Sequence, residues 1–133
     1  GGAAVQMGSI WLPWGFEQKA GQSSEGYVRI VQFDPTEKRK MVEDFNAAFR
    51  AKYGANETPT HINAHAYDTI LLISEAVRRG ATDSESMRDR LSKMKGVEVT
   101  TGTISFDEKG QNSDLSVIHI VETQKDLSWK TLR

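Results

Sequence analysis

The sequence contains no cysteine in its 133 residues, which excludes a disulfide framework, a thiol nucleophile and thiolate-bound metal clusters. It also lacks a run of about 18 apolar residues, the length that a membrane-spanning helix requires. Its first residues lack the positive charge that begins a signal peptide. The 17 basic and 18 acidic side chains nearly cancel, so no overall positive potential exists to attract nucleic acid. These absences do not determine the cellular compartment.

The composition, with 38% hydrophobic and 26% charged residues, is that of an ordinary globular protein, and the length corresponds to about one domain. The beginning of the chain is unusual, because Gly1 and Gly2 lead directly into strand-like apolar residues at 3–7. Complete domains usually begin with a polar, frayed segment. We therefore expect a fragment of a longer protein. The alternative is that foreign residues precede a short first strand.

Hydrophobic periodicity predicts four strands and three helices. The expected strands are residues 5–10, 27–33, 102–106 and 115–122, and the expected helices are residues 35–53, 63–79 and 83–95. The order of two strands, three helices and two strands predicts an α/β domain with helices packed on a sheet.

Two helix starts are predicted from capping patterns. Asp34 can cap the first helix, Pro35 suits its first position, and Glu37 can complete a capping box. Thr82 and Glu85 have the same spacing before the third helix.

The sequence offers little that could carry catalysis. It contains no GxSxG motif and no glycine-rich phosphate loop. His61, His65 and Asp68 have a spacing that a helix would place on one side, as in a histidine–carboxylate metal site, but no HExxH motif accompanies them. The alternative is that Asp68 and His65 hydrogen-bond the loop and first turn of the helix. His119 is expected to be a satisfied core or edge residue. We predict neither an enzyme, a metal site nor a cofactor.

An aromatic segment, residues 11–16, follows the first predicted strand and contains three large rings. The end of a strand is where α/β proteins present ligands. No charged residue lies between Gln6 and Phe16, so we expect stacking and apolar contact rather than ionic selection. The alternative is that the rings only cover the sheet or fill the core.

Several motifs resemble, in order, those of the type 1 periplasmic binding proteins, in the leucine/isoleucine/valine-binding branch that serves ABC importers. They are Met7-Gly8, the segment AGQSSEG at 20–26, an F-x-x-x-F-x-x-x-Y helix at 45–53, Ala66-Tyr67-Asp68 and GTISFDEKG at 102–110. The last is the most specific. The resemblance spans nearly the whole chain but covers only the last third of a family member.

The resemblance implies three-layer α/β/α lobes of the type 1 periplasmic binding protein fold, of which this chain would hold the C-terminal portion. Residues 1–33 would belong to the second lobe, residues 34–113 to the first, and residues 114–133 would form a return strand and tail. Apolar surfaces would then be left uncovered. We therefore expect either the remaining part of the same protein or a swapped homodimer to cover them.

The family's loop after Met7-Gly8 lies in the ligand cleft and, in amino-acid binders, supplies a carboxylate for the ligand's ammonium group. Here the corresponding residues are Ser9, Ile10 and Trp11, and none is acidic. An apolar wall cannot compensate a buried cation, which favours a ligand without that ammonium, such as an aromatic carboxylate. By the same resemblance, His65 is a second contact.

The expected function is therefore capture of a small organic ligand by closure of two lobes, and delivery to an ABC permease. The expected location is periplasmic or extracellular. A ligand-sensing regulatory domain of the same fold is the alternative, and a metal-dependent enzyme is a weaker one.

Overall fold

The computed structural model describes residues 7–8 and 15–132, and the chain divides into two compact units. Unit 1 consists of Gly1–Asp34 and Ile118–Arg133, and unit 2 consists of Pro35–Val117. The chain therefore passes from unit 1 to unit 2 and back. Both units combine helices with strands, so the predicted α/β class is confirmed. The assignment of segments to two family lobes stays a prediction.

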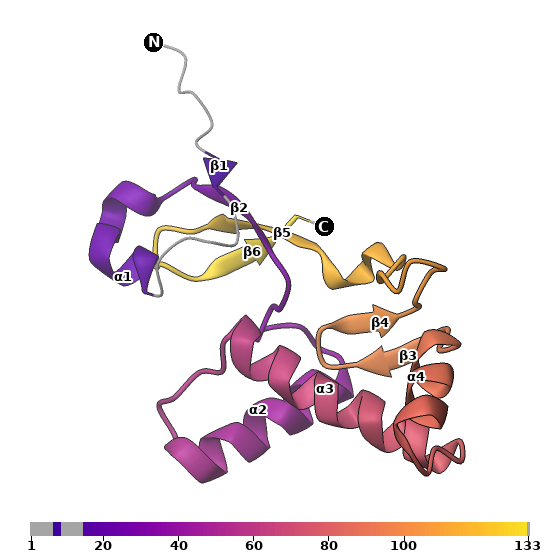
Figure 1. Cartoon of the computed structure of the whole chain (residues 1–133). Helices are drawn as coiled ribbons and strands as arrows, with labels where there is room; N and C mark the ends of the chain where they lie inside the picture. The colour runs from indigo at the N-terminus through magenta and orange to yellow at the C-terminus, as the bar shows by residue number, and fades with distance from the viewer. Residues whose placement is uncertain (1–6, 9–14, 133) are drawn as a thin grey trace. The chain divides into compact units, whose positions relative to one another are not determined.

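Unit 1 is built on a four-stranded sheet with the order β1-β2-β5-β6. β1 is parallel to β2, whereas β5 is antiparallel to both β2 and β6 (Figure 1). A short helix and a 3-10 turn, η1, connect β1 to β2. The bounds are β1 (Met7–Gly8), α1 (Phe16–Ala20), η1 (Gly21–Ser24), β2 (Val28–Val31), β5 (His119–Thr123) and β6 (Trp129–Thr131).

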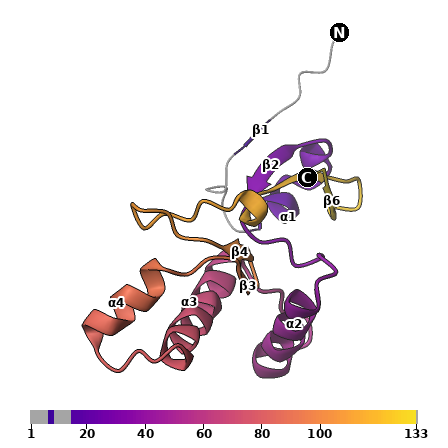
Figure 2. The same cartoon turned by 90° about the vertical axis from the view of Figure 1, so that its right-hand side faces the viewer.

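Unit 2 contains three helices and a β-hairpin. Within this unit, α3 lies between α4 and α2 (Figure 2). Its small core joins the end of α3 to α4, with Ala76, Ala81 and Met94 fully or nearly buried. The bounds are α2 (Lys40–Tyr53), α3 (His61–Arg78), α4 (Ser84–Ser92), β3 (Val97–Val99), β4 (Gly102–Ile104) and the 3-10 turn η2 (Leu115–Val117).

The predicted start of the first long helix is wrong, because the expected capping groups bind elsewhere. Asp34 accepts a hydrogen bond from the hydroxyl of Thr131 at 2.5 Å, and Glu37 is paired with Arg39. The helix therefore begins at Lys40, and the side chain of its N-cap, Arg39, makes no capping hydrogen bond.

The capping box of α4 lies one residue later than predicted. Asp83 is the N-cap and accepts from the backbone N–H of Ser86 at 2.8 Å, while the Ser86 hydroxyl accepts from the Asp83 N–H at 3.1 Å. The hydrogen bonds from the Ser86 backbone and hydroxyl hold the pKa of Asp83 below its usual value.

The predicted strand at 115–122 is shorter than expected, because its first three residues form η2 and β5 begins at His119. Sequence reasoning missed α1, η1, β3 and β6. Each is five residues or fewer, too short for a helical or strand periodicity to emerge. Among the described helices, none has the length and apolarity of a bilayer span.

Candidate functional site

Three of the predicted ligand contacts, Ser9, Ile10 and Trp11, lie outside the described residues. The segment that contains them, 9–14, begins after Gly8 in β1 and ends before Gly15, the N-cap of α1. The structure describes these two flanking points.

One tyrosine, Tyr27, contacts both flanks of this segment. A Cβ placed on Gly8 would lie 2.0 Å from the Tyr27 hydroxyl oxygen, so only glycine fits beside this ring. The same ring packs against Phe16, with a centroid distance of 5.1 Å. Gly15 has a φ of 71°, a left-handed conformation that glycine adopts without strain. Tyr27 thus lies against both Gly8 and Phe16.

A buried ion pair holds α1 onto the sheet of unit 1. Arg29 on β2 lies 2.6 Å from Glu17 on α1 through Nη2 and Oε1, and both side chains are more than nine-tenths buried. Trp129 on β6 donates its indole N–H to the same Oε1 at 3.1 Å, and its ring centroid lies 4.4 Å from the Arg29 guanidinium carbon. Burial lowers the pKa of Arg29, and the charge of Glu17 opposes this shift. These contacts make the group a structural anchor.

The fourth predicted contact, His65, lies in unit 2, one turn into α3. Its side chain is exposed, and its ring lies edge-on to that of His61 at a centroid distance of 6.4 Å. The helix start is well defined, since Thr60 accepts from the backbone N–H of Asn63 and the Asn63 side chain accepts from the Thr60 N–H at 2.8 Å. An exposed imidazole on a fixed helix end can donate a hydrogen bond to an anionic group.

Asp68 does not join the two histidines. Its carboxylate is turned toward the β3–β4 turn, where Oδ1 accepts from the backbone N–H of Thr100 at 2.8 Å and from the Thr100 hydroxyl. Oδ2 accepts from the N–H and hydroxyl of Thr101 at 3.0 and 2.7 Å. The interpretations of Asp68 as a metal ligand or as a cap of its own helix are both wrong. Within residues 7–8 and 15–132, no three His, Asp or Glu side chains are grouped as a metal site requires.

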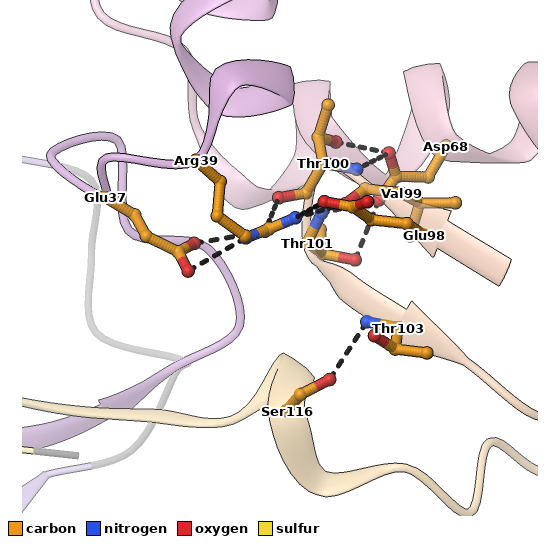
Figure 3. Close-up of polar contacts among 9 residues, drawn as sticks. All are labelled: Glu37, Arg39, Asp68, Glu98, Val99, Thr100, Thr101, Thr103 and Ser116. Atoms are coloured by element: carbon orange, nitrogen blue, oxygen red, sulfur yellow. Dashed lines mark hydrogen bonds and ion pairs between the residues drawn. The ribbon is translucent and has the colours of Figure 1, made fainter. Parts of the chain in front are cut away.

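The same turn is held from its other side by Arg39 (Figure 3). The guanidinium donates to the carbonyl oxygens of Val99 at 2.9 Å and Thr100 at 2.7 Å, and it pairs with Glu37. The hydrogen bond to Glu37 raises the pKa of Arg39 above its usual value. A further bond comes from the Thr103 N–H, which donates to the Ser116 hydroxyl oxygen at 2.9 Å. The hairpin therefore binds segments near both ends of unit 2.

Sequence reasoning missed this polar cluster around the β3–β4 turn. The sequence signal for it is Asp68, the single charged residue within the largely apolar stretch at 61–74, because a lone acid there needs a buried partner. His119 also differs from expectation: it is buried, but its Nε2 makes no hydrogen bond with the described part of the chain.

Comparison with known proteins identifies the family. A family model described as periplasmic binding protein matches residues 6–124. The chain belongs to this family. The resemblance found in the sequence is thus confirmed. A search of curated protein sequences gave no match.

Solved structures of binding proteins superpose on nearly the whole chain. A branched-chain amino acid substrate-binding protein, LivJ, from Streptococcus pneumoniae in complex with isoleucine is 28% identical with a TM-score of 0.74, and the match covers 96% of this chain and 35% of that one. A putative branched-chain amino acid ABC transporter protein from Rhodospirillum rubrum shares the fold at 24% identity and a TM-score of 0.80, covering 99% and 38%.

The chain therefore spans well under half the length of these relatives. The matched family and its structural neighbours are solute-binding proteins, which confirms the expectation of a non-enzymatic family.

The contact between Gly8 and Tyr27 yields a first prediction. Gly8→Ala should destabilise unit 1 by about 1–3 kcal/mol, because the new methyl group must displace the Tyr27 ring. All three tryptophans belong to unit 1, so urea unfolding followed by tryptophan fluorescence measures the loss. In a Tyr27→Ala background the same substitution should cost little, and an equal cost there would contradict the steric explanation.

Asp68 yields a second prediction. Asp68→Ala should destabilise unit 2 by about 3 kcal/mol, since it leaves two buried N–H groups and two hydroxyls without their acceptor. Urea unfolding followed by far-UV circular dichroism reports on α2, α3 and α4, which all lie in this unit. Asp44→Ala, which removes an exposed pair with Lys40, is the matched control and should have a much smaller effect. Equal losses would refute the role assigned to Asp68.

Proposed function

We propose that this chain is the C-terminal part of an extracytoplasmic solute-binding protein, which captures a small organic ligand by closure between two lobes and delivers it to an ABC permease. The observation that carries the proposal is the 28% identity, over 96% of the chain, to a binding protein whose structure contains isoleucine. The family match over residues 6–124 supports it. Membership of a periplasmic binding protein family also supports a periplasmic or extracellular location.

Within this proposal, residues 1–33 belong to the second lobe, residues 34–113 to the first, and residues 114–133 return to the second. The division of the chain at 34/35 and 117/118 into two compact units supports such an exchange between lobes. Two crossings of the chain also provide two connections about which closure can occur.

The proposed ligand contacts are Ser9, Ile10, Trp11 and His65. Ser9 donates a hydrogen bond, Trp11 stacks on the ligand, and the His65 imidazole donates to a carboxylate. The first group directly follows Gly8, which the Tyr27 ring approaches closely, and a rigid neighbouring point in unit 1 supports binding contacts beside it. The exposure of His65 on a capped helix supports the second.

The ligand is either branched-chain amino-acid-like or an aromatic carboxylate. The residues at 9–11 contain no acid to pair with an ammonium group, which favours a carboxylate that lacks one. Isothermal titration calorimetry of the full-length protein that contains this chain, against leucine, isoleucine, valine and benzoate, separates the two classes. Binding of benzoate without binding of leucine supports the aromatic class, tight binding of leucine overturns the argument from the missing acid, and no binding of any of the four contradicts solute capture within these classes.

Substitution of His65 tests its role directly. His65→Ala should weaken binding of the carboxylate ligand about tenfold, the effect of losing one hydrogen bond to a charged group. Calorimetry measures the change, and circular dichroism confirms that the helix persists. Ser74→Ala, an exposed position on the same helix, is the matched control and should bind as the unsubstituted protein does. Unchanged affinity in His65→Ala would remove this residue from the site.

A further inference from the structure

Unit 1 contains a pocket at the turn between β5 and β6. It has a volume of about 580 Å³ and is open to solvent. Its residues come from η1 and from this turn, two segments that are far apart in the sequence. They are Gln22, Gln124, Lys125, Asp126 and Ser128. The pocket shares no residue with the ligand contacts proposed above.

The pocket lies at the end of the sheet that is remote from the two chain crossings at 34/35 and 117/118. β2 ends at Val31 and β5 begins at His119, close in sequence to these crossings, and the two residues are paired. The pocket is at the other end of β5, where Thr123 leads into the turn. A molecule bound in this pocket therefore contacts unit 1 away from its connections to unit 2.

Hydrogen bonds from both segments fix the shape of the pocket. Gln22 Nε2 donates to the carbonyl oxygen of Lys125 at 2.9 Å, which joins η1 to the turn. The turn is closed by Gln124, whose N–H donates to the Ser128 carbonyl at 2.8 Å, and by Leu127, whose N–H donates to the Gln124 carbonyl at 2.9 Å. Leu127 has a φ of 66°, and no other non-glycine residue in the described part of the chain has a positive φ. Such strained backbone is typical of functional sites.

The pocket presents one positive and one negative group. The Lys125 ammonium makes no ion pair or hydrogen bond within the described part of the chain. Asp126 uses Oδ1 to accept from the Ser128 N–H at 3.0 Å and from the Ser128 hydroxyl at 2.5 Å, and its Oδ2 accepts from no described residue. The hydroxyl and N–H of Ser128 lower the pKa of Asp126, so this carboxylate is ionised at neutral pH.

Two glutamine side chains add hydrogen-bond acceptors beside these charges. The amide nitrogen of Gln22 donates to Lys125, and that of Gln124 donates to the carbonyl oxygen of Glu122 at 3.2 Å. Each amide thus uses an N–H within the chain and keeps its Oε1 as an acceptor. A ligand's ammonium group has three N–H donors for Asp126 and these amide oxygens, and a ligand's carboxylate can pair with Lys125.

We propose that this pocket binds a small zwitterion that carries both an ammonium and a carboxylate group, as α-amino acids do, with the ammonium on Asp126 and the carboxylate on Lys125. The site is additional to the proposed function and does not depend on it. A zwitterion forms both ion pairs, whereas an ion of one sign forms only one. Because both side chains are exposed, each pair is weak, and we expect a dissociation constant on the order of 1 mM. At that affinity the pocket fills only where the zwitterion is abundant.

Titration with glycine, the smallest such zwitterion, tests the site in the full-length protein that contains this chain. NMR spectra of isotope-labelled protein report where the ligand binds. We expect saturable shifts of the amide signals of Gln22 and residues 124–128. Acetate and methylammonium carry one charge each and should bind at least about threefold more weakly, the effect of losing one exposed ion pair.

Substitutions in the turn test the two charges. Lys125→Ala and Asp126→Asn should each weaken glycine binding about threefold. Asparagine keeps an Oδ1 that can accept from Ser128, so the turn is retained while the charge is lost. Lys130→Ala removes an exposed lysine of β6 outside the pocket, and this matched control should bind glycine as the unsubstituted protein does.

The other outcomes overturn the proposal. These are no saturable shift at residues 124–128 up to roughly tens of millimolar glycine, or shifts confined to other parts of the protein. Equal binding of glycine and of acetate or methylammonium would show that one charge is sufficient. Unchanged binding in both turn variants would remove Lys125 and Asp126 from the site. The comparison of the three ligands uses the unsubstituted protein, so it decides the question even if a variant misfolds.

Discussion

The carboxylate of Asp68 is the interaction on which the arrangement of unit 2 depends. It accepts hydrogen bonds from two consecutive backbone N–H groups and two hydroxyls at the β3–β4 turn. A two-stranded hairpin without such support would be only marginally stable. Because the turn is fixed to α3, the carbonyl groups on its other side are held in place for Arg39. One buried charge on a helix thus positions a hairpin, and through it the segment that enters the unit.

Sequence reasoning predicted the α/β class, the three long helices and the family, because these depend on periodic patterns and on motifs such as GTISFDEKG at 102–110. It failed where a residue's partner is distant in sequence. Asp34 looks like a helix cap, but its partner is Thr131, and Asp68 looks like a metal ligand or a local cap, but its partners are Thr100 and Thr101. A side-chain oxygen accepts a hydrogen bond equally well from a donor that is close in sequence and from one that is distant in sequence. Local spacing alone therefore cannot identify the donor.

The two units are stabilised in different ways. Unit 1 relies on a sheet and on the buried group of Glu17, Arg29 and Trp129. In this group the indole of Trp129 contacts both members of the ion pair, through its N–H to Glu17 and its ring to Arg29. Unit 2 relies on helix packing around buried apolar residues such as Ala76 and Met94, and on the polar turn. The proposed ligand contact His65 lies near the start of α3, which is fixed by the capping box of Thr60 and Asn63.

The pairing of β2 with β5 has a consequence for how the protein folds during its synthesis. Val28 is paired with Glu122 and Val31 with His119, so the central pairing of unit 1 joins residues separated by most of the chain. Unit 2 lies wholly between them and is continuous. During synthesis the ribosome releases all of unit 2 before β5 exists, so β2 emerges early, beside β1 but without its β5 partner. Synthesis therefore favours one folding order: unit 2 can form first, and the sheet of unit 1 is completed only after β5 and β6 have emerged.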